Sequence, residues 1–236
     1  MEIKDSSEDP KSNTFWFSSR DEVISFDNLV KSYLEERKQP VLSYYSLVPA
    51  YDKLDSRLFY SYFDIVISII HLDYDIWTGA QIWNEKFSKK ESAKGSILDS
   101  RDNFFGKMDI HRYHVASVLR YRAIWDKIMG FLILMFSPED YSVFAKADSR
   151  KKSFKKILQK HLDRWPYLSD IIKIIDGPLT EFDNKFRTPE AHFTGRLRIW
   201  SFMMLSWKED PTFDLYGYCN LLNHVMIKIK ELVDIS

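Results

Sequence analysis

The chain has little of what disulfide-stapled and turn-rich folds need. Only one of its 236 residues is a cysteine, Cys219, so the chain cannot form an internal disulfide or a zinc site built from several thiolates. Cys219 falls in an apolar helical pattern and is expected to be a small buried hydrophobe. Seven glycines, eight prolines and no Asn-Gly pair argue against a fold made of many short strands and hairpins.

The chain also lacks a charge excess and a long hydrophobic run. Lys and Arg together number 34, as do Asp and Glu, which excludes a protein that coats nucleic acid through bulk charge but allows a local basic site. The longest apolar run, 128–136, is about half the length of a membrane span. Residues 1–10 are polar and predict no signal peptide. The sequence therefore indicates a cytoplasmic protein that makes no membrane contact.

What the chain does contain is a helical pattern. Hydrophobic residues make up 45% of it and aromatic residues 16%, and they recur at three- and four-residue steps. This pattern predicts an all-α protein, an up-and-down bundle of long antiparallel helices. Long helices are expected over about 54–87 and 108–137, with a polar loop over 88–107 and a last helix opened by Pro211.

Three parts are expected along the chain. Residues 1–14 are polar and predict a disordered tail. Residues 15–53 predict a helical extension and a connector that packs on the bundle. Residues 54–236 predict the helical bundle itself, with shorter helices starting at Ser137-Pro138, near Arg150 and near Pro166.

The richest cluster of chemically active side chains is the stretch from Phe186 to His192. Thr188 is a good N-cap and Pro189 suits the first position of a helix, so a helix break is expected at Arg187 and a new helix at Pro189. His192 would then lie in the first turn of the new helix. An arginine, a histidine and free helix N–H groups together predict a phosphate site. Arg196, four residues after His192, would share its helix face.

The spacing from Arg187 to His192 resembles the Arg-x(4–6)-His motif of the HEPN superfamily. A second stretch, which runs from Arg120 to Lys127 and includes Arg122 and Asp126, is similar to an Arg-then-Asp-Lys helix of some bacterial HEPN-like branches. The resemblance covers roughly residues 55–235 and implies a HEPN-like helical bundle. In active members the residue after the arginine is commonly Asn, His or Asp, whereas here it is Thr188.

The resemblance implies a metal-independent endoribonuclease of the kind found in toxin–antitoxin and bacterial defence systems. Two chains would face one shared groove as a homodimer, with RNA as substrate, an antitoxin or other partner protein, and no metal or cofactor. His192 would be the acid and base, and Arg187 would clamp the phosphate, with Thr188 and Glu190 assisting by hydrogen bonds. Attack of the ribose 2′-OH would leave a 2′,3′-cyclic phosphate and a 5′-hydroxyl.

A second interpretation stays open, that of a non-catalytic helical module that binds RNA or protein. In that case Arg187 pairs with a carboxylate such as Asp126 or Asp183, and His192 is a buried histidine. Arg122 and Asp126, four apart on one helix face, would either form a structural ion pair or orient the site of Arg187 and His192.

Two further patterns concern charge and metal. A solvated helix face or an RNA-phosphate contact is expected from a run of cations on one helix face: Arg150, Lys151, Lys152, Lys155 and Lys156. His71 and Asp75 share a face, as a hydrogen-bonded pair or as part of the site near His192. His111 and His114 are three apart but lack a third ligand, so no metal site is expected.

Overall fold

The computed structural model describes residues 54–86, 101–188 and 211–235. Every regular element in these residues is helical, which confirms the all-α prediction. The predicted tail over 1–14 and the extension over 15–53 lie outside the described residues. So do residues 88–100 of the predicted loop, and Glu190, His192 and Arg196 of the predicted site.

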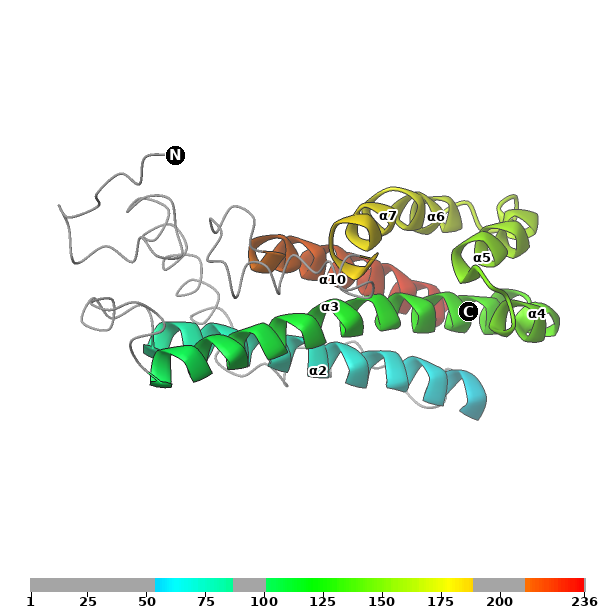
Figure 1. Ribbon diagram of the computed structural model, residues 1–236. Coiled ribbons are helices and arrows are strands. Elements are labelled where there is room, and N and C mark those ends of the chain that lie inside the picture. Colours follow the sequence, from blue (N-terminus) through cyan, green and yellow to red (C-terminus); the bar gives the residue numbers. More distant parts are fainter. Residues whose placement is uncertain (1–53, 87–100, 189–210, 236) are drawn as a thin grey trace, which may run out of the picture.

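Two long helices form the base of the fold. α2 (Ser56–Lys86) and α3 (Arg101–Phe136) run antiparallel along each other (Figure 1). Asp55 caps α2, because its Oδ1 accepts a hydrogen bond from the Leu58 N–H at 2.9 Å. Pro138 follows the end of α3, and it cannot continue a helix because it lacks an N–H.

The predicted bounds of α2 are confirmed, but those of α3 are wrong at its start. Residues 101–107 are helical, although their polar composition suggested a loop. The early turns of α3 lie beside the last turns of α2 (Figure 1), and Gly106 and Ile110 are buried there. Packing between long helices outweighs weak local propensity.

The remaining elements are short, apart from the last helix. In chain order they are a 3₁₀ turn (Pro138–Asp140), α4 (Tyr141–Ala145), α5 (Arg150–Leu158), a second 3₁₀ turn (Gln159–His161), α6 (Leu168–Asp176), α7 (Pro178–Phe182), a π-helical turn (Asp183–Arg187) and α10 (Pro211–Ile235). α4 and α5 lie at the end where α2 begins and α3 ends (Figure 1). The predicted start of α10 at Pro211 is confirmed.

The core is centred on α3, which contacts α2, α4, α5, the π-helical turn and α10. Fully buried side chains on α3 include Tyr121, Ile124, Trp125 and Ile128. Leu119, on the same helix, is 49% exposed. Within the described ranges, no helix is long and apolar enough to cross a membrane. Because the elements that contact α3 are far apart along the chain, the side chains that meet on α3 come from distant parts of the sequence.

Candidate functional site

Arg187 lies at the end of a π-helical turn rather than at a helix break. The Thr188 N–H bonds to the Asp183 carbonyl, five residues back, and Thr188 has helical dihedral angles, φ −63° and ψ −47°. An N-cap residue has a non-helical backbone, so the predicted break at Arg187 and the N-cap at Thr188 are wrong. π-Helical turns are rare and are often found at functional sites. This turn therefore makes the surroundings of Arg187 a candidate functional site.

Aromatic packing holds the π-helical turn in place. Phe182 and Phe186 are fully buried at its two ends. The Phe182 ring lies 4.4 Å from the Tyr121 ring on α3 and 5.0 Å from the Tyr218 ring on α10, measured between centroids. Phe186 meets Tyr218 edge to face at 6.1 Å. This packing buries one side of the turn and leaves Arg187 and Thr188 exposed on the other side.

Four charged side chains fix the same turn to α3 and α5. We call Arg122, Asp126, Lys151 and Asp183 the Arg122 cluster. The Arg122 side chain is 8% exposed, and its Nε lies 3.0 Å from Asp183 Oδ1 and donates to Asp183 Oδ2 at 3.3 Å. Lys151 Nζ reaches Asp183 Oδ2 at 3.1 Å. The cluster therefore ties the turn that carries Arg187 to two other helices.

Asp126 completes the charge balance of the cluster. Its Oδ1 lies 2.6 Å from Arg122 Nη1, and this contact is electrostatic because the two atoms lack hydrogen-bond geometry. Two cations thus face two carboxylates, which is the condition under which buried charges are tolerated. The expected ion pair between Arg122 and Asp126 is confirmed. The expected pairing of Arg187 with Asp126 or Asp183 is wrong, because Arg122 and Lys151 occupy these carboxylates.

Arg187 itself is exposed and makes no ion pair with any residue in the described parts of the chain. Its guanidinium therefore stays available for an anion from outside this part of the molecule. Glu190, His192 and Arg196 lie outside the described residues. Arg187, Thr188, Arg122 and Asp126 are the predicted site residues that the structure brings to one region.

The cations of α5 are less free than their number suggests. Lys151 contacts Asp183 and Lys155 pairs with Asp176, while Lys160, in the 3₁₀ turn after α5, lies 3.4 Å from Asp140. Arg150 Nη1 is 3.9 Å from Asp126 Oδ2. Among the described residues, Lys152 and Lys156 are exposed and form no ion pair. Any phosphate contact by the predicted basic face would thus depend mainly on these two lysines and on Arg150, whose contact with Asp126 is loose.

The histidine patterns have structural explanations. Asp75 accepts a hydrogen bond from Arg120 Nε at 2.9 Å, and His71 Nδ1 lies 3.5 Å from Arg120 Nη1, so both residues meet an arginine of α3 that the sequence pattern did not assign to them. Burial lowers the pKa of His114 to about 3, with a further contribution from the charge of His111. The described residues contain no group of three side chains able to hold a metal ion.

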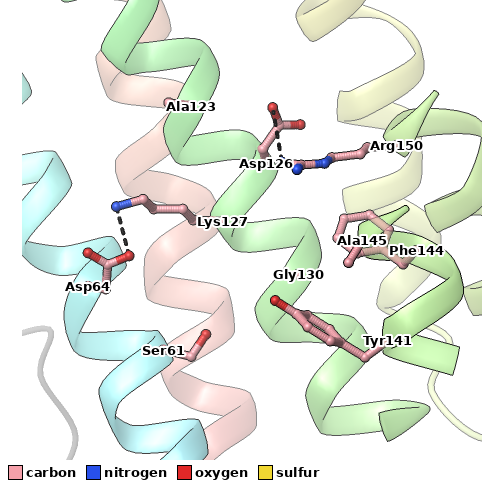
Figure 2. A pocket seen from close by; sticks show the side chains of 10 residues that line it. All are labelled: Ser61, Asp64, Ala123, Asp126, Lys127, Gly130, Tyr141, Phe144, Ala145 and Arg150. Atoms are coloured by element: carbon pink, nitrogen blue, oxygen red, sulfur yellow. Dashed lines mark ion pairs between the residues drawn. The ribbon is translucent and has the colours of Figure 1, made fainter. Parts of the chain in front are cut away.

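A pocket of about 310 Å³ is lined in part by Asp126 (Figure 2). α3 forms its floor, α2 one wall, and α4 with the first residue of α5 the other. The lining residues are Ser61, Asp64, Ala123, Asp126, Lys127, Gly130, Tyr141, Phe144, Ala145 and Arg150. Sequence reasoning missed this pocket. The available signal was the mixture of small and charged residues at positions 123, 126, 127 and 130, which share one face of the helix.

Comparison of the chain with models of known families, with curated proteins and with solved structures finds no match in any of the three.

Proposed function

We propose that the protein is a metal-independent endoribonuclease of the HEPN type, in which Arg187 clamps the scissile phosphate. The observation that carries this proposal is the state of Arg187: an exposed arginine without an ion pair in the described residues, held on an anchored turn. The two carboxylates expected as its partners, Asp126 and Asp183, contact Arg122 and Lys151 instead.

The Arg122 cluster supports this role electrostatically. A phosphate that approached Arg187 would otherwise meet the negative charges of Asp183 and Asp126. Both carboxylates contact Arg122, and Lys151 adds a second cation at Asp183. The cluster thus cancels repulsion near the turn while Arg187 keeps its donors for phosphate oxygens.

The remaining chemistry is assigned to His192, which follows Arg187 by five positions in the sequence. A histidine titrates near neutral pH, so it can take the proton of the ribose 2′-OH and return one to the leaving 5′-oxygen. One arginine and one histidine per chain are few for both tasks. We therefore propose a homodimer in which the motifs of two chains share one groove.

RNA cleavage in EDTA tests the proposal directly. The purified protein is expected to cleave a mixed RNA pool in EDTA and to leave 2′,3′-cyclic phosphate ends. His192→Ala and Arg187→Gln should each lower the rate by roughly 10²-fold or more, because each removes a transition-state interaction. The matched controls are His224→Ala on α10 and Arg112→Gln on α3, both exposed positions, and these should cleave like the original protein.

Two results would contradict the nuclease proposal. One is cleavage that requires a divalent metal ion, and the other is cleavage that is equal in the His192 and Arg187 variants and their controls. Absence of cleavage together with retained RNA binding would favour the second candidate, a non-catalytic RNA-binding module. The specific observation for that candidate is the exposure of Lys152 and Lys156 on α5 without ion pairs among the described residues.

A further inference from the structure

We propose that the pocket between α2, α3 and α4 binds a small zwitterion of the free α-amino acid class, held between Asp126 and Arg150. We call it the α3 pocket, after the helix that forms its floor. No role in RNA cleavage is assigned to it, and the proposal does not depend on Arg187 or His192. It rests on the shape of the pocket and on the distribution of charge along its walls.

The shape suits a small molecule. The pocket volume of about 310 Å³ is at the lower end of the range for small-ligand sites, and it exceeds the volume of a single amino acid. Ala123 and Gly130 are the small residues of the floor, about 10 Å apart along α3, with Asp126 and Lys127 between them. A Cβ placed on Gly130 would lie 3.5 Å from the Phe144 ring, so the glycine leaves open the space beside this aromatic wall.

The charge of the lining is mixed rather than of one sign. Asp64 and Asp126 supply two negative charges, and Lys127 and Arg150 supply two positive charges (Figure 2). A phosphate would meet both carboxylates, and a polyamine would meet both cations, so each would face repulsion within the pocket. A zwitterion presents one charge of each sign and can find an opposite partner for both.

The two ion pairs of the pocket differ in their N···O distances, and this difference indicates which pair binds the ligand. Lys127 Nζ lies 2.7 Å from Asp64 Oδ2 and donates to Ser68 Oγ at 2.8 Å, so this lysine is well satisfied. Arg150 Nη1 is 3.9 Å from Asp126 Oδ2, which is beyond hydrogen-bond distance. The Arg150 fork is therefore free to bind a carboxylate through two parallel hydrogen bonds.

Asp126 offers the complementary acceptor. Its Oδ1 is held against Arg122, whereas its Oδ2 faces Arg150 across the loose contact. The carboxylate and ammonium groups of an amino acid are attached to the same carbon, so they can bind side by side from within the pocket, the carboxylate to Arg150 and the ammonium to Asp126, without entering the 3.9 Å gap between these two side chains. Its side chain would then extend along Gly130 toward Tyr141 and Ser61, whose hydroxyl groups border the pocket (Figure 2).

Calorimetric titration of the full chain with each standard L-amino acid tests the proposal. At least one is expected to bind, and its N-acetyl and carboxamide derivatives, which each lack one charge, should bind at least 10-fold more weakly. Arg150→Gln should weaken binding by a similar factor. Lys156→Gln, which removes an exposed cation from the same helix, should leave binding unchanged. Gly130→Ala adds a methyl group in ordinary contact with Phe144, and should weaken binding while the protein stays folded.

Three outcomes would overturn the proposal. The first is that no amino acid binds at about 10 mM, a concentration at which even weak specific sites fill. The second is equal binding by the amino acid and its singly charged derivatives. The third is unchanged affinity in Arg150→Gln, checked by circular dichroism to be folded. None of these outcomes bears on cleavage through Arg187 and His192, which is measured separately in EDTA.

Discussion

At the scale of single residues, Arg122 is the side chain on which most of the local structure depends. It is 8% exposed, and transferring its charge out of water costs several kcal/mol unless nearby opposite charges offset that cost. Asp126 on the same helix and Asp183 on the π-helical turn are these opposite charges. The same contact desolvates the two carboxylates, so all three groups depend on one another.

Replacement of Arg122 by methionine should therefore be costly. The change keeps the volume of the side chain but leaves Asp126 and Asp183 without their main cation. Because Lys151 still contacts Asp183, we expect a loss of about 3 kcal/mol in the free energy of unfolding, at the lower end for a broken buried ion pair. Urea denaturation measures this loss. Arg112→Met, which breaks an exposed pair with Asp109, should cost under about 1 kcal/mol, and equal losses would contradict the assigned role.

His114 makes stability depend on pH. Its pKa in the folded protein is about 3, chiefly because of burial, whereas an unfolded histidine titrates near 6.5. Between these values the unfolded chain binds a proton that the folded protein does not bind, so acid favours unfolding. From pH 6.5 to 5.5 the protein should lose about 1 kcal/mol more unfolding free energy than His114→Gln. Denaturation curves at both pH values give the difference, and parallel losses in the two proteins would refute the assignment.

At the scale of elements, α5 is a basic helix whose charges mostly serve the fold. Lys155 pairs with Asp176 at the end of α6, and Lys151 reaches the π-helical turn. Exposed ion pairs contribute little stability individually, but here each one joins α5 to a different neighbour. The helix can therefore be recognised as basic from sequence, while its free charge is much smaller than its cation count.

The two unpaired lysines of α5 predict how much RNA affinity this helix can supply. If the helix contacts single-stranded RNA, the double variant Lys152→Gln and Lys156→Gln should make the negative slope of log affinity against log salt concentration shallower by about 1.4. The paired double variant Lys151→Gln and Lys155→Gln should change the slope less and reduce stability instead. Filter binding at several salt concentrations separates these outcomes. A larger change of slope in the paired variant would show that the ion pairs open on binding.

The sequence predicted the long elements well, whereas Glu190, His192 and Arg196 of the predicted site lie outside the described residues. α2, α3 and α10 carry sustained apolar stripes, and long periodic segments give the strongest sequence signal for a helix. The turn at Arg187 was predicted wrongly because Thr188-Pro189 is a good local start signal, whereas Phe182 and Phe186 are anchored by rings of α3 and α10. The hydrogen bond from Arg122 to Asp183 spans 61 positions, so no local spacing could reveal it.

At the scale of the whole molecule, the proposed dimer makes a prediction of its own. Arg187→Gln and His192→Ala should each cleave far more slowly than the original protein, but a mixture allowed to exchange subunits should recover part of the activity. A mixed dimer keeps one arginine and one histidine in its shared groove, whereas each variant dimer lacks one of the two kinds entirely, so its rate should lie above that of either variant and below that of the original protein. The control is the double variant mixed with each single variant, which should recover nothing. Recovery is measured by RNA cleavage in EDTA, and no recovery despite proven exchange would mean that each chain carries a separate site.

α3 connects these features, and Asp126 is the point where they meet. One carboxylate oxygen of Asp126 contacts Arg122, which holds the turn of Arg187, and the other faces Arg150 at the α3 pocket. A ligand that drew Asp126 toward the pocket would weaken its contact with Arg122, which holds the turn of Arg187. Any effect of that ligand on anion affinity at Arg187 must be reciprocal: whatever factor the pocket ligand applies to anion affinity, the anion applies to the affinity of the pocket ligand.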